Sequence, residues 1–198
     1  MSELFSIQLQ NRQQQGRDGV WLDLPTTTEQ VQAALRQIGI SSDNPQGLFI
    51  SGYFAEEEKR IAIPYNMVLA SNVDELNFLA SRLETLSTGE RAELNAALQA
   101  PQSELFSIGR ITDFPENVDY YVHLPDVHGP AQLGDYYLNR SGMVDMPEEW
   151  KGGIDTAQFG RYVAQQEQGA FTQYGYLVKS GDEWQKVHEG QPVPEEYR

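Results

Sequence analysis

The chain has 198 residues and carries 29 Asp and Glu against 14 Lys and Arg, which gives a formal net charge of −15 at pH 7. A charge of this sign disfavours binding to nucleic acid or to an anionic membrane and favours a partner protein with a basic surface, although it also serves solubility alone. The lack of cysteine excludes a disulfide framework, a thiolate zinc site and a cysteine nucleophile.

The first part of the chain is predicted to contain two strands. Residues 5–9 alternate between apolar and polar, as in a half-buried strand, and residues 20–24 form a second strand that Pro25 ends. The N-terminus has no basic stretch followed by an apolar run, so we expect no signal peptide and a cytoplasmic location. The longest apolar stretch, 61–70, is about half the length that a membrane helix needs.

A helix and two more strands are predicted next. Thr26 and Glu29 have the spacing of a capping box, so we expect a helix that begins here and ends at Gly39. Its apolar stripe consists of Val31, Ala34, Leu35 and Ile38. Two strands are then expected at 47–53 and 60–63. They are joined by an acidic turn that contains Glu56, Glu57 and Glu58.

Two short helices are predicted between residues 71 and 101. Ser71 followed by Asp74 indicates the start of the first helix, whose leucines fall at helical spacing. Ser87 and Glu90 have the spacing of a second capping box, and Pro101 closes the second helix. Because neither helix can bury its apolar face alone, we expect a helical hairpin.

The last hundred residues repeat part of the opening pattern. The hexapeptide SELFSI stands at 2–7 and again at 103–108, and a strand-like segment ending in Leu-Pro follows each copy. The repeat indicates either a duplicated α/β unit or a chance similarity. Beyond it we expect two helices and two strands, at 131–139, 155–165, 171–178 and 184–187. The tail GQPVPEEYR is expected to be extended and loosely held.

These elements predict an α+β fold with small α/β units flanking a central helical segment. The predicted divisions are an N-terminal α/β unit at 1–70, a helical hairpin at 71–101 and a C-terminal α/β unit at 102–198. A hydrophobic fraction of 39% with 11% aromatic residues supports a folded core and distinguishes the chain from a disordered acidic tail.

The sequence gives little support for catalysis. It contains no phosphate loop, dinucleotide fingerprint or Gly-x-Ser-x-Gly elbow, so we expect no enzyme and no cofactor. His123 with Asp119 and Asp126 leaves a metal-dependent hydrolase open as an alternative. Their spacing matches no zinc pattern, however, and a structural or surface histidine is the simpler interpretation.

The carboxylates fit a binding surface better. Like charges on neighbouring helix positions cost a few tenths of a kcal/mol per pair, and a purely structural helix would interleave lysines, of which the chain has four. DNA carries one charge per about 3.4 Å of axis on each strand, so acids at comparable spacing can replace phosphates in a basic groove. The predicted phosphate-mimicking acids are Glu56, Glu57, Glu58, Asp74, Glu75, Glu84, Glu90, Glu93, Asp113, Glu116, Asp119, Asp126, Asp135, Asp145, Glu148, Glu149 and Asp155.

Three runs of the chain carry a family resemblance. They are GVWLDLPTTTEQVQAALRQIGI at 19–40, NVDELNFLASRLETLSTGERAELNAAL at 72–98 and IDTAQFGRYVAQQEQGAFTQYGYL at 154–177. In this order they resemble the ArdA antirestriction proteins of mobile elements, particularly the forms of Gram-positive bacteria. The most specific pieces are the Trp-Leu-x-Leu-Pro strand end, the Leu-Asn-x-Leu-Ala helix and the aromatic stretch at 171–176.

The resemblance implies an elongated, three-part molecule, often a dimer, that mimics bent DNA. Such a protein blocks type I restriction-modification enzymes by occupying their DNA-binding groove and binds no nucleic acid directly. One alternative is an acidic interaction module of a mobile element that binds another basic protein, and the metal-dependent hydrolase is the other.

Overall fold

The computed structural model describes residues 3–14, 18–41, 46–56 and 60–198. The chain forms two compact units, each built from segments that are separated in sequence. Unit 1 consists of Met1–Ser87, Leu105–Glu116 and Gln185–Arg198, and unit 2 consists of Thr88–Glu104 and Asn117–Trp184. Small antiparallel sheets combined with helices confirm the predicted α+β class. The division into three segments at 1–70, 71–101 and 102–198 stays a prediction.

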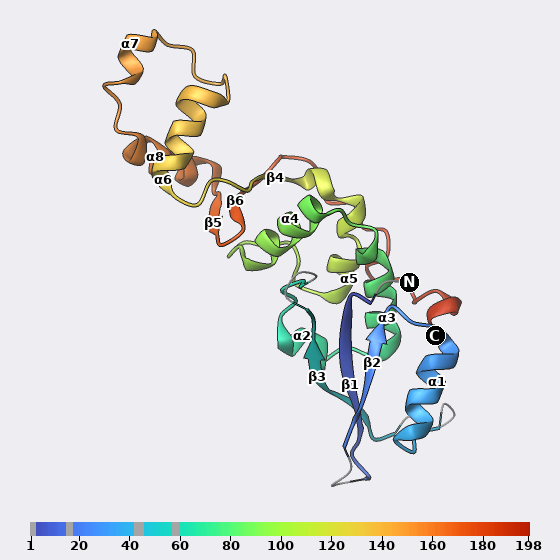
Figure 1. Cartoon of the computed structure of the whole chain (residues 1–198). Coiled ribbons are helices and arrows are strands. Elements are labelled where there is room, and N and C mark those ends of the chain that lie inside the picture. Colours follow the sequence, from blue (N-terminus) through green and yellow to red (C-terminus); the bar gives the residue numbers. More distant parts are fainter. Residues whose placement is uncertain (1–2, 15–17, 42–45, 57–59) are drawn as a thin grey trace. The chain divides into compact units, whose positions relative to one another are not determined.

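The elements of unit 1 are a three-stranded sheet and several short helices (Figure 1). In chain order they are β1 (Phe5–Asn11), β2 (Val20–Leu24), α1 (Thr28–Gln37), β3 (Leu48–Phe54), α2 (Tyr65–Leu69), α3 (Val73–Glu84), α5 (Ile108–Thr112), η2 (Phe114–Glu116) and η5 (Glu195–Tyr197). Strand β1 is central and pairs antiparallel with both neighbours. Ile7 lies opposite Leu22, so the buried side chains of both strands share one face of the sheet.

Helix α1 begins one residue later than the sequence suggests. The N-cap is Thr27, whose side chain accepts a hydrogen bond from the Gln30 amide, so the expected pair of Thr26 and Glu29 is wrong. Thr26 instead anchors helix α3: its backbone N–H donates to Asn77 Oδ1 at 2.8 Å, and Asn77 Nδ2 donates to the Thr26 carbonyl at 3.0 Å. Asn77 is fully buried, and these two bonds satisfy its amide.

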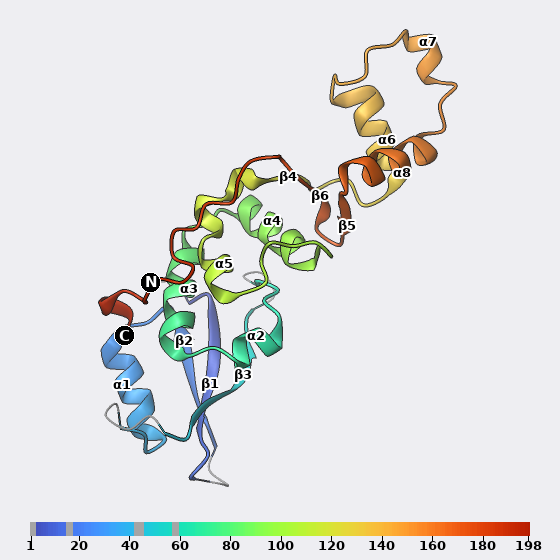
Figure 2. The ribbon, with the colours of Figure 1, turned by 180° about the vertical axis from the view of Figure 1, so that it is seen from behind.

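The C-terminal tail is packed against unit 1, contrary to the expectation of a loose end. The Tyr197 ring lies 5.1 Å from that of Phe78 on α3, and the Thr28 hydroxyl donates to the Arg198 carbonyl at 3.3 Å. Figure 2 shows this last helical turn, η5, beside α1 and α3. The end of the tail is therefore held against α1 and α3, although none of its residues is buried.

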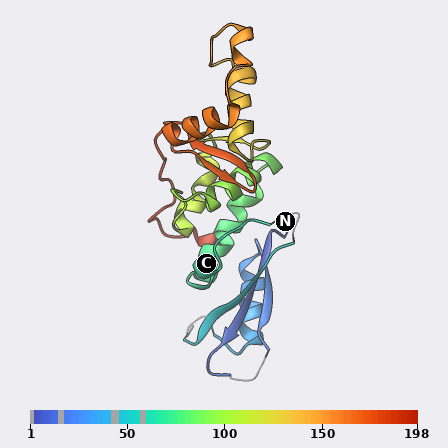
Figure 3. The ribbon, with the colours of Figure 1, turned by 90° about the vertical axis from the view of Figure 1, so that its left-hand side faces the viewer.

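Unit 2 contains a second antiparallel sheet, of strand order β4-β6-β5, with helix α4 packed on β4 and β6 (Figure 3). Its elements are α4 (Thr88–Gln99), η3 (Val118–Tyr120), β4 (Tyr121–Leu124), α6 (Pro130–Asp135), a π-helical turn η4 (Tyr136–Arg140), α7 (Glu148–Lys151), α8 (Thr156–Glu167), β5 (Ala170–Thr172) and β6 (Gly175–Lys179). Val127, Leu133 and Tyr176 form its buried cluster.

Helices α6 and α8 approach each other so closely that two glycines are required between them. A Cβ on Gly160 would lie 1.8 Å from the Pro130 carbonyl oxygen, and one on Gly134 would lie 1.9 Å from the Thr156 carbonyl oxygen. Any side chain at either position would force the helix backbones apart.

Several predicted elements are confirmed and others are wrong. Both helices of the expected hairpin form, as α3 and α4, although α3 is capped by Asn72 and Glu75 and not by Ser71 and Asp74. The strand expected at 60–63 is absent: Ile61 and Ile63 are buried, but in an irregular segment. The strand expected at 184–187 is also absent from this described segment.

Candidate functional site

The predicted acids of unit 1 differ widely in exposure. Glu56 is exposed, whereas Asp74, Glu75, Glu84 and Glu116 are half-buried. Partial burial raises the pKa of Asp74, an effect that Arg198 opposes and Glu75 reinforces. Glu57 and Glu58 lie outside the described residues.

Asp113 is fully buried and serves the fold. Its Oδ1 accepts a hydrogen bond from the backbone N–H of His188 at 2.6 Å, and its Oδ2 accepts one from Glu189 at 3.2 Å. Arg110 and Glu189 form an ion pair at 3.0 Å nearby. Because its carboxylate holds the returning tail, Asp113 does not face a partner, and we leave it out of the proposed surface.

Two further acids of unit 1 have internal partners. Glu116 forms an ion pair with Arg82 of α3. Glu75 completes the capping box of α3, since its Oε2 accepts from the Asn72 backbone N–H at 3.3 Å. Each carboxylate therefore already has a partner within the protein, Arg82 for Glu116 and the start of α3 for Glu75, which reduces the charge that it presents to solvent.

Glu93 on α4 is the most perturbed carboxyl of unit 2. Burial, followed by the charges of Glu90 and Asp119, raises its pKa to about 8. At neutral pH this side chain is therefore mostly protonated and contributes little negative charge. Glu90 and Asp119 lie close enough to act on it, so the structure brings these three predicted acids together.

Other acids of unit 2 hold local structure. Asp155 is the N-cap of α8 and accepts from the backbone amides of Ala157 and Gln158, both at 2.9 Å. Asp135 pairs with Arg140 at 3.4 Å. These carboxylates stay at or near the surface, but each already compensates a positive group or a helix terminus.

The segment from Met143 to Lys151, here called the α7 segment, exposes acids beside large apolar side chains. The side chains of Met143 and Trp150 are 74% and 67% exposed. Asp145, Glu148 and Glu149 are exposed as well, and Glu148 lies 2.9 Å from Lys151. Figure 1 shows α7 at the far end of a long loop that leaves η4 and returns to α8. An exposed aromatic ring among carboxylates is a combination that a basic protein surface can bind.

The hydrolase alternative gains no geometric support. The ring Nε2 of His123 lies 2.7 Å from the Tyr174 carbonyl oxygen, which accounts for this side chain as a link between β4 and the β5–β6 turn. Among the described residues, no group of three or more His, Asp or Glu side chains is arranged to hold a metal ion.

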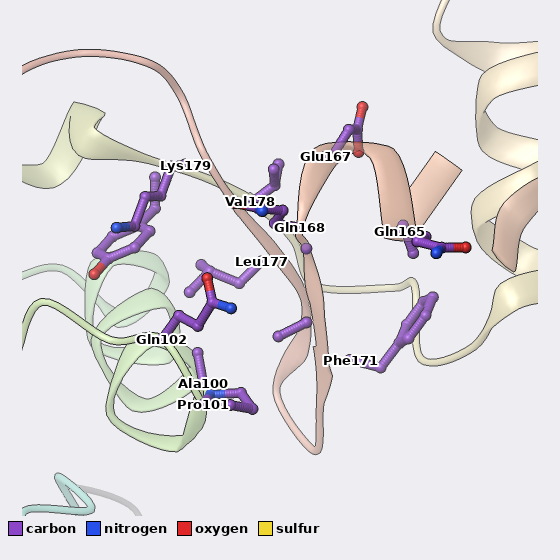
Figure 4. Close-up of a pocket in the computed structure, with 14 residues that line it drawn as sticks. Ala100, Pro101, Gln102, Gln165, Glu167, Gln168, Phe171, Leu177, Val178 and Lys179 are labelled. Carbon is purple, nitrogen blue, oxygen red and sulfur yellow. The ribbon is translucent and has the colours of Figure 1, made fainter. Parts of the chain in front are cut away.

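A pocket of about 440 Å³ opens beside β6 in unit 2 (Figure 4). Figure 4 shows Gln102, Leu177 and Lys179 on one side of the strands and Phe171 and Gln165 on the other. Lys179 pairs with Glu104 at 2.7 Å, so its charge is balanced within the protein.

Glu167, which also lines this pocket, holds two tyrosines. It accepts from Tyr137 Oη at 2.5 Å and from Tyr176 Oη at 3.0 Å. Burial, together with the carboxylate, raises the pKa of both phenols, so they remain neutral donors. We assign these groups a structural role.

Comparison with known families identifies the chain. A family model described as "Antirestriction protein (ArdA)" matches residues 15–178. The chain belongs to the ArdA antirestriction family. A comparison with curated proteins gives no match. The family match contains all three runs from which the resemblance was inferred, and so confirms it.

Membership of the ArdA family implies interaction with restriction-modification enzymes. Asp119, Asp126, Asp145, Glu148 and Glu149 are the exposed predicted acids of unit 2 that do not cap a helix. Within the part of the chain that the structure describes, no helix has the length and apolar character to cross a membrane.

Sequence reasoning missed the apolar members of the α7 segment. Met143 and Trp150 sit in a stretch rich in glycine, proline and acids, SGMVDMPEEWKGG at 141–153. Large apolar residues without helical or strand periodicity in such a stretch are a signal for exposure, because no regular element is there to bury them.

Proposed function

We propose that the protein is a non-enzymatic antirestriction protein that occupies the DNA-binding groove of a type I restriction-modification enzyme in place of DNA. The ArdA family match over residues 15–178 is the observation that carries this proposal. The net charge of −15 supports the mechanism, because a polyanion competes with DNA for rows of Lys and Arg. No cofactor takes part. The dimer that the resemblance implies stays a prediction.

The α7 segment is the part of unit 2 best suited to the contact. Its exposed carboxylates attract a basic groove, and Trp150 supplies a large apolar surface that gains free energy when water is excluded. The carboxylates thus speed the association with the partner, and burial of the aromatic ring slows its dissociation.

The first test is inhibition of DNA cleavage by purified type I restriction-modification enzymes at increasing salt. A mimic that replaces six to ten phosphate contacts should lose roughly 10³–10⁵-fold in affinity between 50 and 200 mM salt. Failure to block DNA binding by any type I enzyme at low ionic strength would refute the mimicry.

A matched pair of variants tests where the contact lies. Converting Asp145, Glu148 and Glu149 to amides should weaken inhibition. The slope of the logarithm of affinity against the logarithm of salt concentration should become less steep by about two to three. The control converts three other exposed acids, Glu183, Glu195 and Glu196, and changes the net charge equally. Equal losses in both variants would show that only net charge matters. Full inhibition by the first variant would remove the α7 segment from the interface.

The acidic interaction module remains the rival, and the same protein separates the two. Capture of a different basic protein, together with no effect on type I enzymes, would favour the rival. Binding of that protein to the variant with amides at Asp145, Glu148 and Glu149 would then show whether these carboxylates make the contact.

A further inference from the structure

A groove of about 570 Å³ runs beside β2 in unit 1. Four consecutive residues of this strand, Val20 to Asp23, line the groove. Successive side chains of a strand point to opposite faces of the sheet, so a groove lined by consecutive residues follows the edge of the strand. β2 is a terminal strand, with β1 as its neighbour on the other side. In an antiparallel sheet every second residue of such a strand directs its N–H and C=O groups outward.

Helix α1 forms the opposite wall of the groove. Its lining residues, Gln30, Ala33, Ala34 and Gln37, recur at helical spacing and therefore form one stripe. Two alanines in the middle of the stripe leave room for the backbone of another chain, and the glutamines at its ends can donate and accept hydrogen bonds. Figures 1 and 2 both show α1 running alongside the sheet.

The charge of the groove selects a basic occupant. Glu3 and Asp23 line it, and no Lys or Arg is among the described residues that line it. The Ser6 hydroxyl oxygen lies 3.2 Å from Glu3 Oε1 and 2.8 Å from Asp23 Oδ1, so its single hydrogen can hold either carboxylate at one end of the groove. A second copy of this chain, itself at −15, matches these two carboxylates less well than a basic segment does.

We propose that an extended, Lys- or Arg-bearing segment of a partner protein binds in this groove and adds a fourth strand to the sheet at β2, with its cations beside Glu3 and Asp23. Strand addition supplies backbone hydrogen bonds for affinity, and the flanking side chains supply specificity. The proposal is independent of the restriction-enzyme contact, because it needs only an edge strand, a small-residue helix face and two acids.

The test uses the full chain and an eight-residue peptide of alternating lysine and valine with blocked ends. Amide NMR should show saturable shifts in β2 and α1, and exchange of the outward β2 amides should slow at least fivefold. A peptide with glutamate in place of lysine should not bind. The absence of saturable shifts at β2, or equal binding of the glutamate peptide, would overturn the proposal.

Two variants locate the site. Ala33→Arg fills the groove with a cation and should weaken binding of the lysine peptide at least tenfold. Gln32→Arg adds the same charge to α1 at a residue that does not line the groove and should bind like the unmodified chain. Equal affinity of both variants would also overturn the proposal. No restriction enzyme enters this test, so its result is separate from that of the proposed function.

Discussion

The contact between α6 and α8 makes a sharp prediction about stability. A Cβ on Gly160 would lie 1.8 Å from the Pro130 carbonyl oxygen and 2.8 Å from the Gly134 nitrogen, whereas real Cβ atoms keep at least 3.0 Å from such atoms. In Gly160→Ala the two helices must therefore separate by roughly 1.2 Å. Backbone atoms, and not flexible side chains, are in the way, so local relaxation cannot remove the clash.

The expected cost follows from two opposing effects. Overpacking costs about 1–3 kcal/mol, and more when a backbone has to move, because the cluster around Leu133 and Tyr176 then loses contacts. The better helix propensity of alanine returns up to about 1 kcal/mol. We expect Gly160→Ala to destabilise the protein by about 2–3 kcal/mol, which lowers the melting temperature by about 5–10 °C for a chain of this size.

The control is Gly89→Ala in α4, also in unit 2. A Cβ there would have no neighbour within 4 Å, so only the helix propensity changes, and stability should stay equal or rise by up to about 1 kcal/mol. Urea and thermal unfolding followed by circular dichroism compare both variants with the unmodified chain. A Gly160→Ala protein as stable as Gly89→Ala would refute the close approach of α6 and α8.

Three further predictions concern buried groups. The pKa of Glu93, raised to about 8, means that stability falls as the pH rises from about 4.5 to 8. Glu93→Gln should make the free energy of unfolding depend less on pH and, after a discount for partial exposure, raise it by about 1–2 kcal/mol at pH 8.5. Unfolding at pH 6 and pH 8.5 measures this change. An unchanged pH dependence would contradict the raised pKa of Glu93. Asp113→Asn removes one hydrogen-bond acceptor for the tail and should lower the free energy of unfolding by about 1–3 kcal/mol. The backbone amides of His188 and Glu189 should exchange faster than in a Glu183→Gln control. Leu83→Ala in the fully buried stripe of α3 should lower the free energy of unfolding in urea by about 2–5 kcal/mol. The salt dependence of inhibition should stay the same. A changed salt dependence would mean that Leu83 acts through the interface.

Local sequence signals predicted the helices well. The leucines of α3 fall at helical spacing and are buried, and the helix expected at 155–165 forms as α8, with Asp155 as its N-cap. Errors of one residue at Thr26 and Ser71 arose because neighbouring Thr27 and Asn72 are equally good caps. Residue preferences therefore locate the start of a helix, whereas tertiary contacts decide which of two neighbouring residues caps it. Thr26, for example, binds Asn77 and leaves the cap to Thr27.

The repeated hexapeptide shows where local signals fail. In the first copy Phe5 lies in β1 and is 1% exposed, with strands paired on both sides. In the second copy Phe106 precedes α5, is 63% exposed and lies under the guanidinium of Arg110 at 4.9 Å. The same residues adopt different structures because pairing partners are available to only one copy, so the repeat does not indicate duplicated strands.

The candidate surface was predictable in composition but not in detail. The sequence supplied the excess of acids, and the family runs supplied the partner class. It did not separate exposed acids such as Glu149 from Asp113, which is buried. The apolar neighbours of Asp113 in IGRITDF were the available signal, since an acid in such a stretch needs internal donors.

The order of segments in unit 1 has a consequence for biosynthesis. The chain emerges from the ribosome N-terminus first, so β1 to α3 and the α5 segment are made before residues 185–198 exist. Until then Asp113 lacks the two amides that it binds, and Phe78 lacks Tyr197. Unit 1 therefore completes its packing only after residues 185–198 have been made, whereas all segments of unit 2 have been synthesised before them.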